Sequence, residues 1–157
     1  SHRFAKAKAA GEDMDLSITI KKKGFSTALF KSSHVYHKRR TSWSQFRKQV
    51  ANFGYARITI YKRHPESLKW LHFAPAFFVV GILSLILLSI FVSPLFLLPI
   101  PAHVLILFID ASIQNKSIVI GSMAVVTSYI QLIGYGLGFM KAIWNHVIVG
   151  KEKVPGT

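Results

Sequence analysis

Three carboxylates stand within four residues near the start of the chain, in the stretch "GEDMD". They are Glu12, Asp13 and Asp15, half of the six acidic residues in a chain with twenty Lys and Arg. A carboxylate fixed at one place can take a proton from a substrate hydroxyl, as a general base does. Acids also gather in the first turn of helices, where the helix dipole favours them. Their spacing alone favours the helix-terminal interpretation, so a catalytic one needs support from other motifs.

The residues around these acids predict a short helix. In "EDMDLSITIKKKG" acids lead, lysines trail and Gly24 follows, which suits the helix dipole and a glycine C-cap. Two β-rich runs come next, "FSTALFK" and "HVYH", and they predict short strands. Two short strands need a larger sheet to join. The chain also begins at Ser1 without an initiating Met, so we expect an excised or processed piece of a larger protein.

A second helix is predicted in "TSWSQFRKQVANFGYARITIYKRHP". Thr41 or Ser42 can cap it, and Pro65 ends it. An aromatic and apolar stripe recurs at helical spacing: Trp43, Phe46, Val50 and Phe53. Together with the neighbouring cations, the stripe is typical of an amphipathic helix lying on a bilayer surface. A domain helix that packs the stripe inward fits equally well, and the two interpretations can coexist.

The remainder of the chain is a membrane region. Residues 70–109 and 117–140 contain no Asp, Glu, Lys or Arg. About 20 apolar residues suffice to cross a hydrocarbon core, and residues 72–92 and 117–140 both reach that length. The small residues of the later run suit close helix packing: Gly121, Ser122, Gly134, Gly136 and Gly138.

The middle of the membrane region leaves two topologies open. "PLFLLPIPAHVLILFI" holds three prolines and predicts a compact third crossing or a re-entrant pair of half-helices. Three crossings place Lys141, Lys151 and Lys153 outside, and segment length favours this arrangement. Two crossings with a re-entrant middle place those lysines inside, as the positive-inside rule prefers.

The positive charge lies in the first half. Residues 1–72 hold sixteen Lys and Arg with four acids, whereas residues 73–157 hold four Lys with two acids. Cations beside membrane spans stay on the cytoplasmic side, which disfavours nucleic acid as the partner. The chain has no cysteine, which excludes disulfides and thiolate chemistry.

The order of these elements and four of the sequence words resemble the C-terminal part of a membrane-bound family 2 glycosyltransferase. The words are "GEDMDLSI", "VYHKRRTS", "FRKQVANFG" and, more loosely, "QLIGYGLGF". The resemblance implies a GT-A fold, so the expected fold class is an α/β C-terminal fragment of a GT-A domain. An all-α transmembrane region of two to three hydrophobic helices is expected to follow it.

The resemblance also implies roles for single residues. Asp13 matches the catalytic base of the family's xED motif, with Glu12 beside it. Asp13-Met14-Asp15 also spells D-x-D, the family's metal-binding pattern. That pattern ends an earlier strand in the family, and here the acids open a helix, so we do not assign the metal to it. By the same resemblance His37 is the ligand of a divalent metal, Mg²⁺ or Mn²⁺. Imidazole is a normal ligand for such ions, although a lone histidine is often a surface group.

Donor and acceptor residues follow from the remaining words. Arg39 and Arg40 suit diphosphate oxygens, and contact with anionic lipid is the alternative. Polysaccharide synthases of the family carry Q-x-x-R-W on an interfacial helix. Here Gln49 matches, Asn52 replaces the Arg and Phe53 replaces the Trp. Gln49 and Phe53 are therefore predicted to bind the acceptor, and loss of the Arg favours transfer of a single sugar over processive synthesis.

The predicted function is inverting, metal-dependent transfer of a sugar from a nucleotide-sugar donor to a lipid or glycan acceptor at a membrane. The catalytic side is expected in the cytoplasm, at a bacterial inner membrane, with membrane lipid as a further partner. The alternative is a non-catalytic basic module that anchors to the membrane or binds lipid. Residues 1–40 would end the catalytic domain, residues 41–69 form the interfacial helix and connector, and residues 70–157 form the membrane region with a short basic tail.

Overall fold

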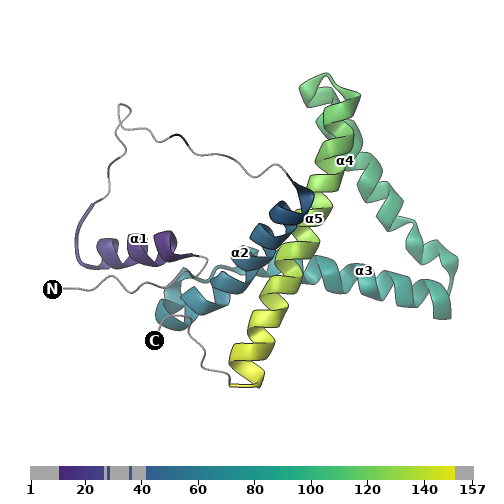
Figure 1. Cartoon of the computed structure of the whole chain (residues 1–157). Coiled ribbons are helices and arrows are strands. Elements are labelled where there is room, and N and C mark those ends of the chain that lie inside the picture. Colours follow the sequence, from purple (N-terminus) through teal and green to yellow (C-terminus); the bar gives the residue numbers. More distant parts are fainter. Residues whose placement is uncertain (1–10, 27, 29–35, 37–41, 151–157) are drawn as a thin grey trace.

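The computed structural model describes residues 11–26, 28, 36 and 42–150 of the 157. Within them the fold consists of five α-helices, and short turns join α2 to α3, α3 to α4 and α4 to α5 (Figure 1). The bounds of the helices are α1 Glu12–Lys22, α2 Trp43–Arg63, α3 Ala74–Phe91, α4 Pro99–Asn115 and α5 Ile118–Ile143. Shorter helical turns cover Pro65–Ser67, Trp70–Phe73 and Pro94–Leu97, and a π-helical turn covers Trp144–Ile148.

The predicted α/β fragment is wrong. No residue in the described part of the chain forms a strand, and the described architecture is all-α. Phe25, Ser26, Ala28 and Tyr36, the described members of the two β-rich runs, lie outside any regular element. The runs are short, and strand propensity depends on partners that complete a sheet. No such partner strand is present among the described residues.

The local predictions for α1 and α2 are confirmed. α1 begins at Glu12 and ends where Gly24 adopts a left-handed φ of +82°, and the Phe25 amide donates to the Ile20 carbonyl at 3.2 Å. Such a 6→1 hydrogen bond is the mark of a glycine-terminated helix. At α2 the Ser42 hydroxyl accepts from the Gln45 amide at 3.3 Å, so Ser42 is the N-cap.

Three helical segments are long and apolar enough to cross a membrane: Trp70–Phe91, Pro94–Asn115 and Ile118–His146. The middle one contains α4 as an unbroken helix, because Pro99 and Pro101 stand in its first turn, where a missing N–H is tolerated. Almost no residue of α3 and α4 is buried. The chain is therefore a membrane protein with three candidate spans, in agreement with the upper end of the prediction.

α5 is the central element, and α2, α3 and α4 all pack on it. α2 lies across its C-terminal half, and the first turn of α3 meets it there. α4 runs back along its N-terminal half, so that α3 and α4 splay into an open triangle (Figure 1). The small buried core lies where α2, α3 and α5 meet, with Phe139 fully buried against Ile58 and Ala142.

Glycine lets α2 and α5 approach closely. A Cβ on Gly138 would collide with the Ala51 carbonyl oxygen, and one on Gly54 would collide with the Tyr135 carbonyl oxygen. A Cβ on Gly134 would likewise lie only 2.7 Å from Val50 Cγ2. Close packing is thus confirmed for the predicted glycines of α5, of which Gly134 and Gly138 meet α2, whereas Ser122 is exposed.

A polar pair joins the candidate spans. His103 of α4 lies 3.0 Å from the Tyr129 hydroxyl of α5, measured from Nδ1. Phe78 of α3 packs against both rings, with centroids 5.5 and 5.7 Å away. Hydrogen bonds between side chains of neighbouring helices help to hold membrane bundles together.

Candidate functional site

The start of α1 rests on α2. Gly11 adopts a left-handed φ of +101°, and the Asp15 amide donates to its carbonyl at 2.9 Å. A Cβ at Gly11 would lie 2.9 Å from Ile60 Cδ1 and 3.3 Å from Ala56 Cβ. A side chain would be strained there by the backbone and by this contact. Gly11 therefore allows the acids that follow it to begin a helix directly against α2.

Asp13 and Asp15 have different surroundings. The Asp15 carboxylate accepts from Arg63 at 2.9 Å and lies 2.8 Å from His64 Nε2, and His64 is buried. Asp13 is exposed, and no described side chain forms a hydrogen bond or ion pair with its carboxylate. The Ser17 hydroxyl donates only to the Asp13 backbone carbonyl. Of the two aspartates, Asp15 docks the helix and Asp13 is open to an incoming hydroxyl.

This pairing bears on the D-x-D alternative. Both carboxylate oxygens of Asp15 already face cationic or hydrogen-bonding partners. In the part of the chain that the structure describes, no group of three or more His, Cys, Asp or Glu is placed to hold a metal ion. His37, the predicted metal ligand, lies outside the described residues. A metal at Asp15 does not fit this geometry, and the metal site at His37 stays a prediction.

A second contact fastens the other end of α1. Lys22 pairs with Glu66 at 2.7 Å, and this hydrogen bond, followed by the backbone amide of Glu66, holds the pKa of the carboxyl below its ordinary value of 4.5. Both side chains are about half exposed, so the pair contributes little by itself. Together with Asp15 it fixes the direction of α1 along the C-terminal half of α2.

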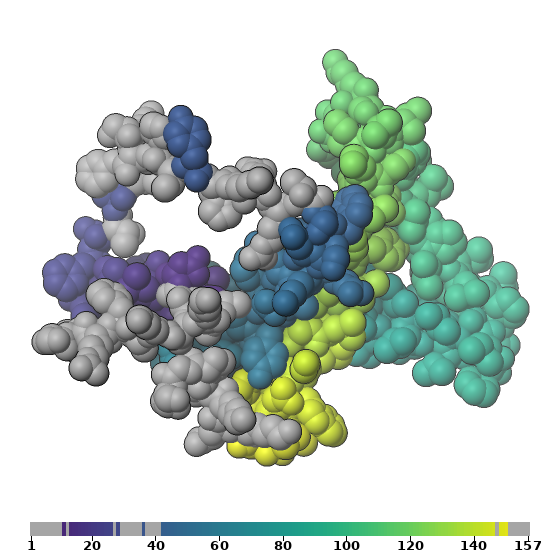
Figure 2. Space-filling view, in the orientation of Figure 1, coloured from purple at the N-terminus to yellow at the C-terminus, as the bar shows by residue number. Residues whose placement is uncertain are grey.

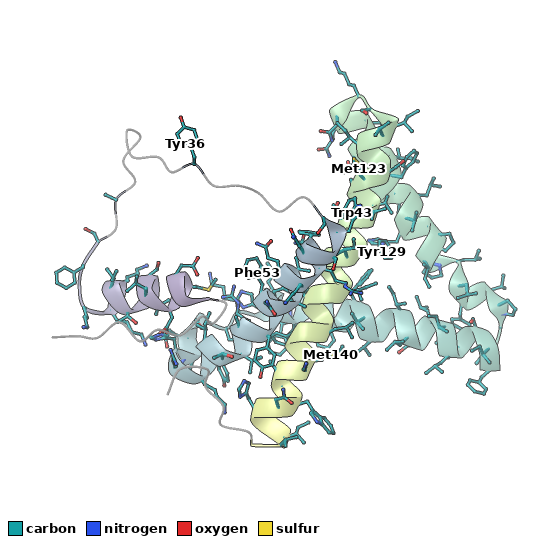
Figure 3. The ribbon with its side chains drawn as sticks, viewed as in Figure 1. Tyr36, Trp43, Phe53, Met123, Tyr129 and Met140 are labelled. Carbon is teal, nitrogen blue, oxygen red and sulfur yellow. The ribbon has the colours of Figure 1, made fainter. Side chains whose placement is uncertain are left out.

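The predicted acceptor residues lie on the α1-facing side of α2. Gln49, Phe53, Ala56 and Ile60 follow one another three or four residues apart and so share one helical face. Gly11 packs on Ala56 and Ile60. Phe53 lies one turn nearer the N-terminus of α2 and is 49% exposed (Figure 3). The structure therefore brings the start of α1 and the predicted aromatic platform to the same side of α2.

Arg57 is a cation at this site that the sequence analysis missed. Its guanidinium lies 3.1 Å from Met14 Sδ and comes from the turn after Phe53. The sequence feature that could have identified Arg57 is its position four residues after Phe53, because residues four apart are neighbours on one helical face. Arg57 can meet negative charge on a substrate bound near Asp13.

Three predicted site residues lie outside the described residues, namely His37, Arg39 and Arg40. Glu12 begins α1, and nothing is described of its side chain. The structure thus places Asp13, Gln49 and Phe53 and leaves the predicted diphosphate and metal ligands untested. Comparison of the chain with protein-family models, with curated proteins and with solved structures finds no match.

Proposed function

We propose that the chain carries the base-bearing, acceptor-facing part of an inverting glycosyltransferase at a membrane. The donor is a nucleotide sugar, and the acceptor is a lipid or glycan hydroxyl at the membrane surface. The observation that carries the proposal is that Asp15 is paired with other side chains whereas Asp13 is exposed. Asp15 is held by Arg63 and His64, so the exposed Asp13 is kept at a fixed place beside α2, which packs on the candidate span α5.

The chemistry follows from these positions. Asp13 accepts the proton of the acceptor hydroxyl while that oxygen bonds to the anomeric carbon. The bond from the anomeric carbon to the diphosphate breaks on the opposite face, and the nucleoside diphosphate leaves with the electron pair. Phe53 offers an exposed ring on which an acceptor sugar can stack, and Gln49 offers an amide for its hydroxyls. Mg²⁺ or Mn²⁺, held with His37, would neutralise the departing diphosphate, with Arg39, Arg40 and Arg57 as further cations.

Substitution of Asp13 by Asn tests the proposal in the enzyme that contains this chain together with its donor-binding part. The amide keeps the shape of the side chain and cannot accept the proton. Turnover should fall about 100-fold or more, the scale of a lost general base, while donor binding is retained. Asp110→Asn, at an exposed aspartate of α4, is the matched control and should leave turnover unchanged. Full turnover by Asp13→Asn would contradict the proposal.

The second candidate function is a non-catalytic basic module that anchors a partner or binds anionic lipid. It is favoured by the exposed cations of α2, among them Arg47, Lys48 and Lys62. The two candidates differ in one measurement. Only the enzyme releases a nucleoside diphosphate from a sugar donor in an Asp13-dependent manner.

A further inference from the structure

A groove of about 650 Å³ lies between the N-terminal half of α2 and the middle of α5. Its volume falls within the range of small-molecule sites, roughly 300–1,000 Å³. The wall from α2 carries cations and the wall from α5 carries aliphatic side chains, and the main lining residues are Arg47, Lys48 and Ala51 facing Ile130, Ile133 and Leu137. Gly134, which also lines the groove, is where α2 and α5 approach closely.

The two walls differ in what they can bind. Ile133 and Leu137 are 36% and 52% exposed, although they belong to a segment apolar enough to cross a membrane. Arg47 and Lys48 are exposed, and neither forms an ion pair with any carboxylate in the described part of the chain. An occupant must therefore combine a hydrocarbon chain with a negative charge at one end.

We propose that this groove binds one molecule of an anionic phospholipid. The phosphate lies between the Arg47 guanidinium and the Lys48 ammonium, and one acyl chain follows Leu137, Ile133 and Ile130 along α5. Arginine suits phosphate because its planar fork matches two oxygens at once. Long cationic side chains also reach from a helix toward headgroups while their stems cover apolar surface. Tyr129, whose hydroxyl pairs with His103, also lines the groove, and it lies near Trp43 at the start of α2 (Figure 3).

The groove is separate from the site at Asp13. Arg47, Lys48 and Ala51 lie on the side of α2 that faces α5, whereas Gln49 and Phe53 lie on the side that faces α1. Figure 2 shows α2 between α1 and α5. The bound lipid is therefore not the acceptor of the proposed reaction. It fixes α2 against α5 in the bilayer, and its binding does not depend on whether the chain acts as a glycosyltransferase.

The full chain is transferred from detergent into nanodiscs that contain both phosphatidylglycerol and phosphatidylcholine. Native mass spectrometry then identifies the lipid that stays bound to the chain. The wild type should retain one phosphatidylglycerol in preference to phosphatidylcholine. Arg47→Gln with Lys48→Gln should reduce that preference about 30-fold, the ratio expected for two cations next to anionic lipid. The paired control Lys23→Gln with Lys62→Gln removes the same charge from exposed positions outside the groove and should keep the preference.

A third variant separates charge from shape. Ile133→Trp keeps both cations and fills the groove, so it should also lose the retained lipid. Equal retention by the wild type and the Arg47/Lys48 variant would overturn the proposal, as would an equal loss in the Lys23/Lys62 control. A concentration-dependent dimer that buries Ile133 would show that a second copy of the chain occupies the groove and would overturn it as well.

Discussion

Two aspartates that stand two residues apart on one helix have different surroundings. Asp15 points at Arg63 and His64, 48 and 49 residues further along the chain. Asp13 has no such partner among the described residues and is exposed. A carboxylate that serves as a base must reach a substrate, and a carboxylate that docks a helix must not be displaced. The difference in surroundings supports the proposal that Asp13 is the base more directly than the sequence "EDMD" does.

Asp15→Asn should loosen α1 without touching the proposed base. The variant removes the charge that faces Arg63 and His64, and hydrogen bonds to charged groups contribute about 1.5–3 kcal/mol. Amide hydrogen exchange within Leu16–Lys22 should quicken about tenfold in detergent micelles, while exchange in α5 stays unchanged. Asp13→Asn is the control and should leave α1 protected. Unchanged protection in Asp15→Asn would show that other contacts hold the helix.

The Lys22–Glu66 pair makes the end of α1 sensitive to acid. The folded-state pKa of Glu66 is lowered by Lys22, so the contact is fully present above the ordinary carboxyl pKa and is lost as pH falls through the lowered one. Because the chain lacks cysteine, a spin label at Lys23→Cys reports on this end alone. Its mobility should rise between pH 6 and pH 3. In a Glu66→Gln background the label should be mobile already at pH 6, and a pH step of the same size there would contradict the assignment.

At the scale of elements, the face of α2 that packs on α5 is not centred on the aromatic stripe seen in its sequence. The aromatic stripe predicts which face is apolar, and Val50 of that stripe is indeed buried, but Trp43 and Phe53 remain about half exposed. The face that packs on α5 is rotated toward Ala51, Gly54 and Ile58. Close approach of two backbones needs small residues on both sides. Large aromatic residues are therefore left at the edge, where they can meet lipid or substrate.

Gly138→Ala should disrupt the contact between α2 and α5. The added methyl group would collide with the Ala51 carbonyl oxygen, part of a backbone that cannot yield without moving the whole helix. Overpacking of this kind costs about 1–3 kcal/mol, so the melting temperature in detergent should fall by about 3–10 °C. Gly81→Ala in α3 is the matched control, because nothing lies within 4 Å of its new Cβ. It should melt at the wild-type temperature or above, and an equal loss in both variants would contradict this account.

At the scale of the whole molecule, contacts along α5 bear on the membrane topology. Gly136 meets Pro75 at the start of α3, and Gly121 meets Ser112 near the end of α4. These glycines are 15 residues apart, about 22 Å along the helix. The start of α3 and the end of α4 therefore lie about 22 Å apart along α5, so α3 and α4 together carry the chain once along the length of α5 (Figure 1). α5 then returns, and His146 in the turn that follows it packs edge-to-face against Tyr55 of α2.

We therefore expect the end of α5 to lie on the same side of the membrane as α2. Single cysteines at Lys62, Asn115 and Val149 can test this in sealed vesicles with a membrane-impermeant maleimide, since the chain has no cysteine of its own. Lys62→Cys and Val149→Cys should react from one side and Asn115→Cys from the other. This arrangement also satisfies the positive-inside rule for Lys141, Lys151 and Lys153. Labelling of Asn115→Cys together with Lys62→Cys, with Val149→Cys reacting from the opposite side, would instead support three full crossings.

The sequence alone determined the elements whose cause is local. Runs of about 20 predominantly apolar residues predict membrane-spanning helices, as the candidate spans bear out, and acids before lysines before glycine delimit α1. The tertiary structure decided which side chains these helices bring together. Asp15 pairs with Arg63, and α2 packs on the glycines of α5. Both contacts join residues that are tens of positions apart in the sequence. The same limit explains the wrong α/β prediction, because a short β-rich run becomes a strand only beside a partner that local pattern does not reveal.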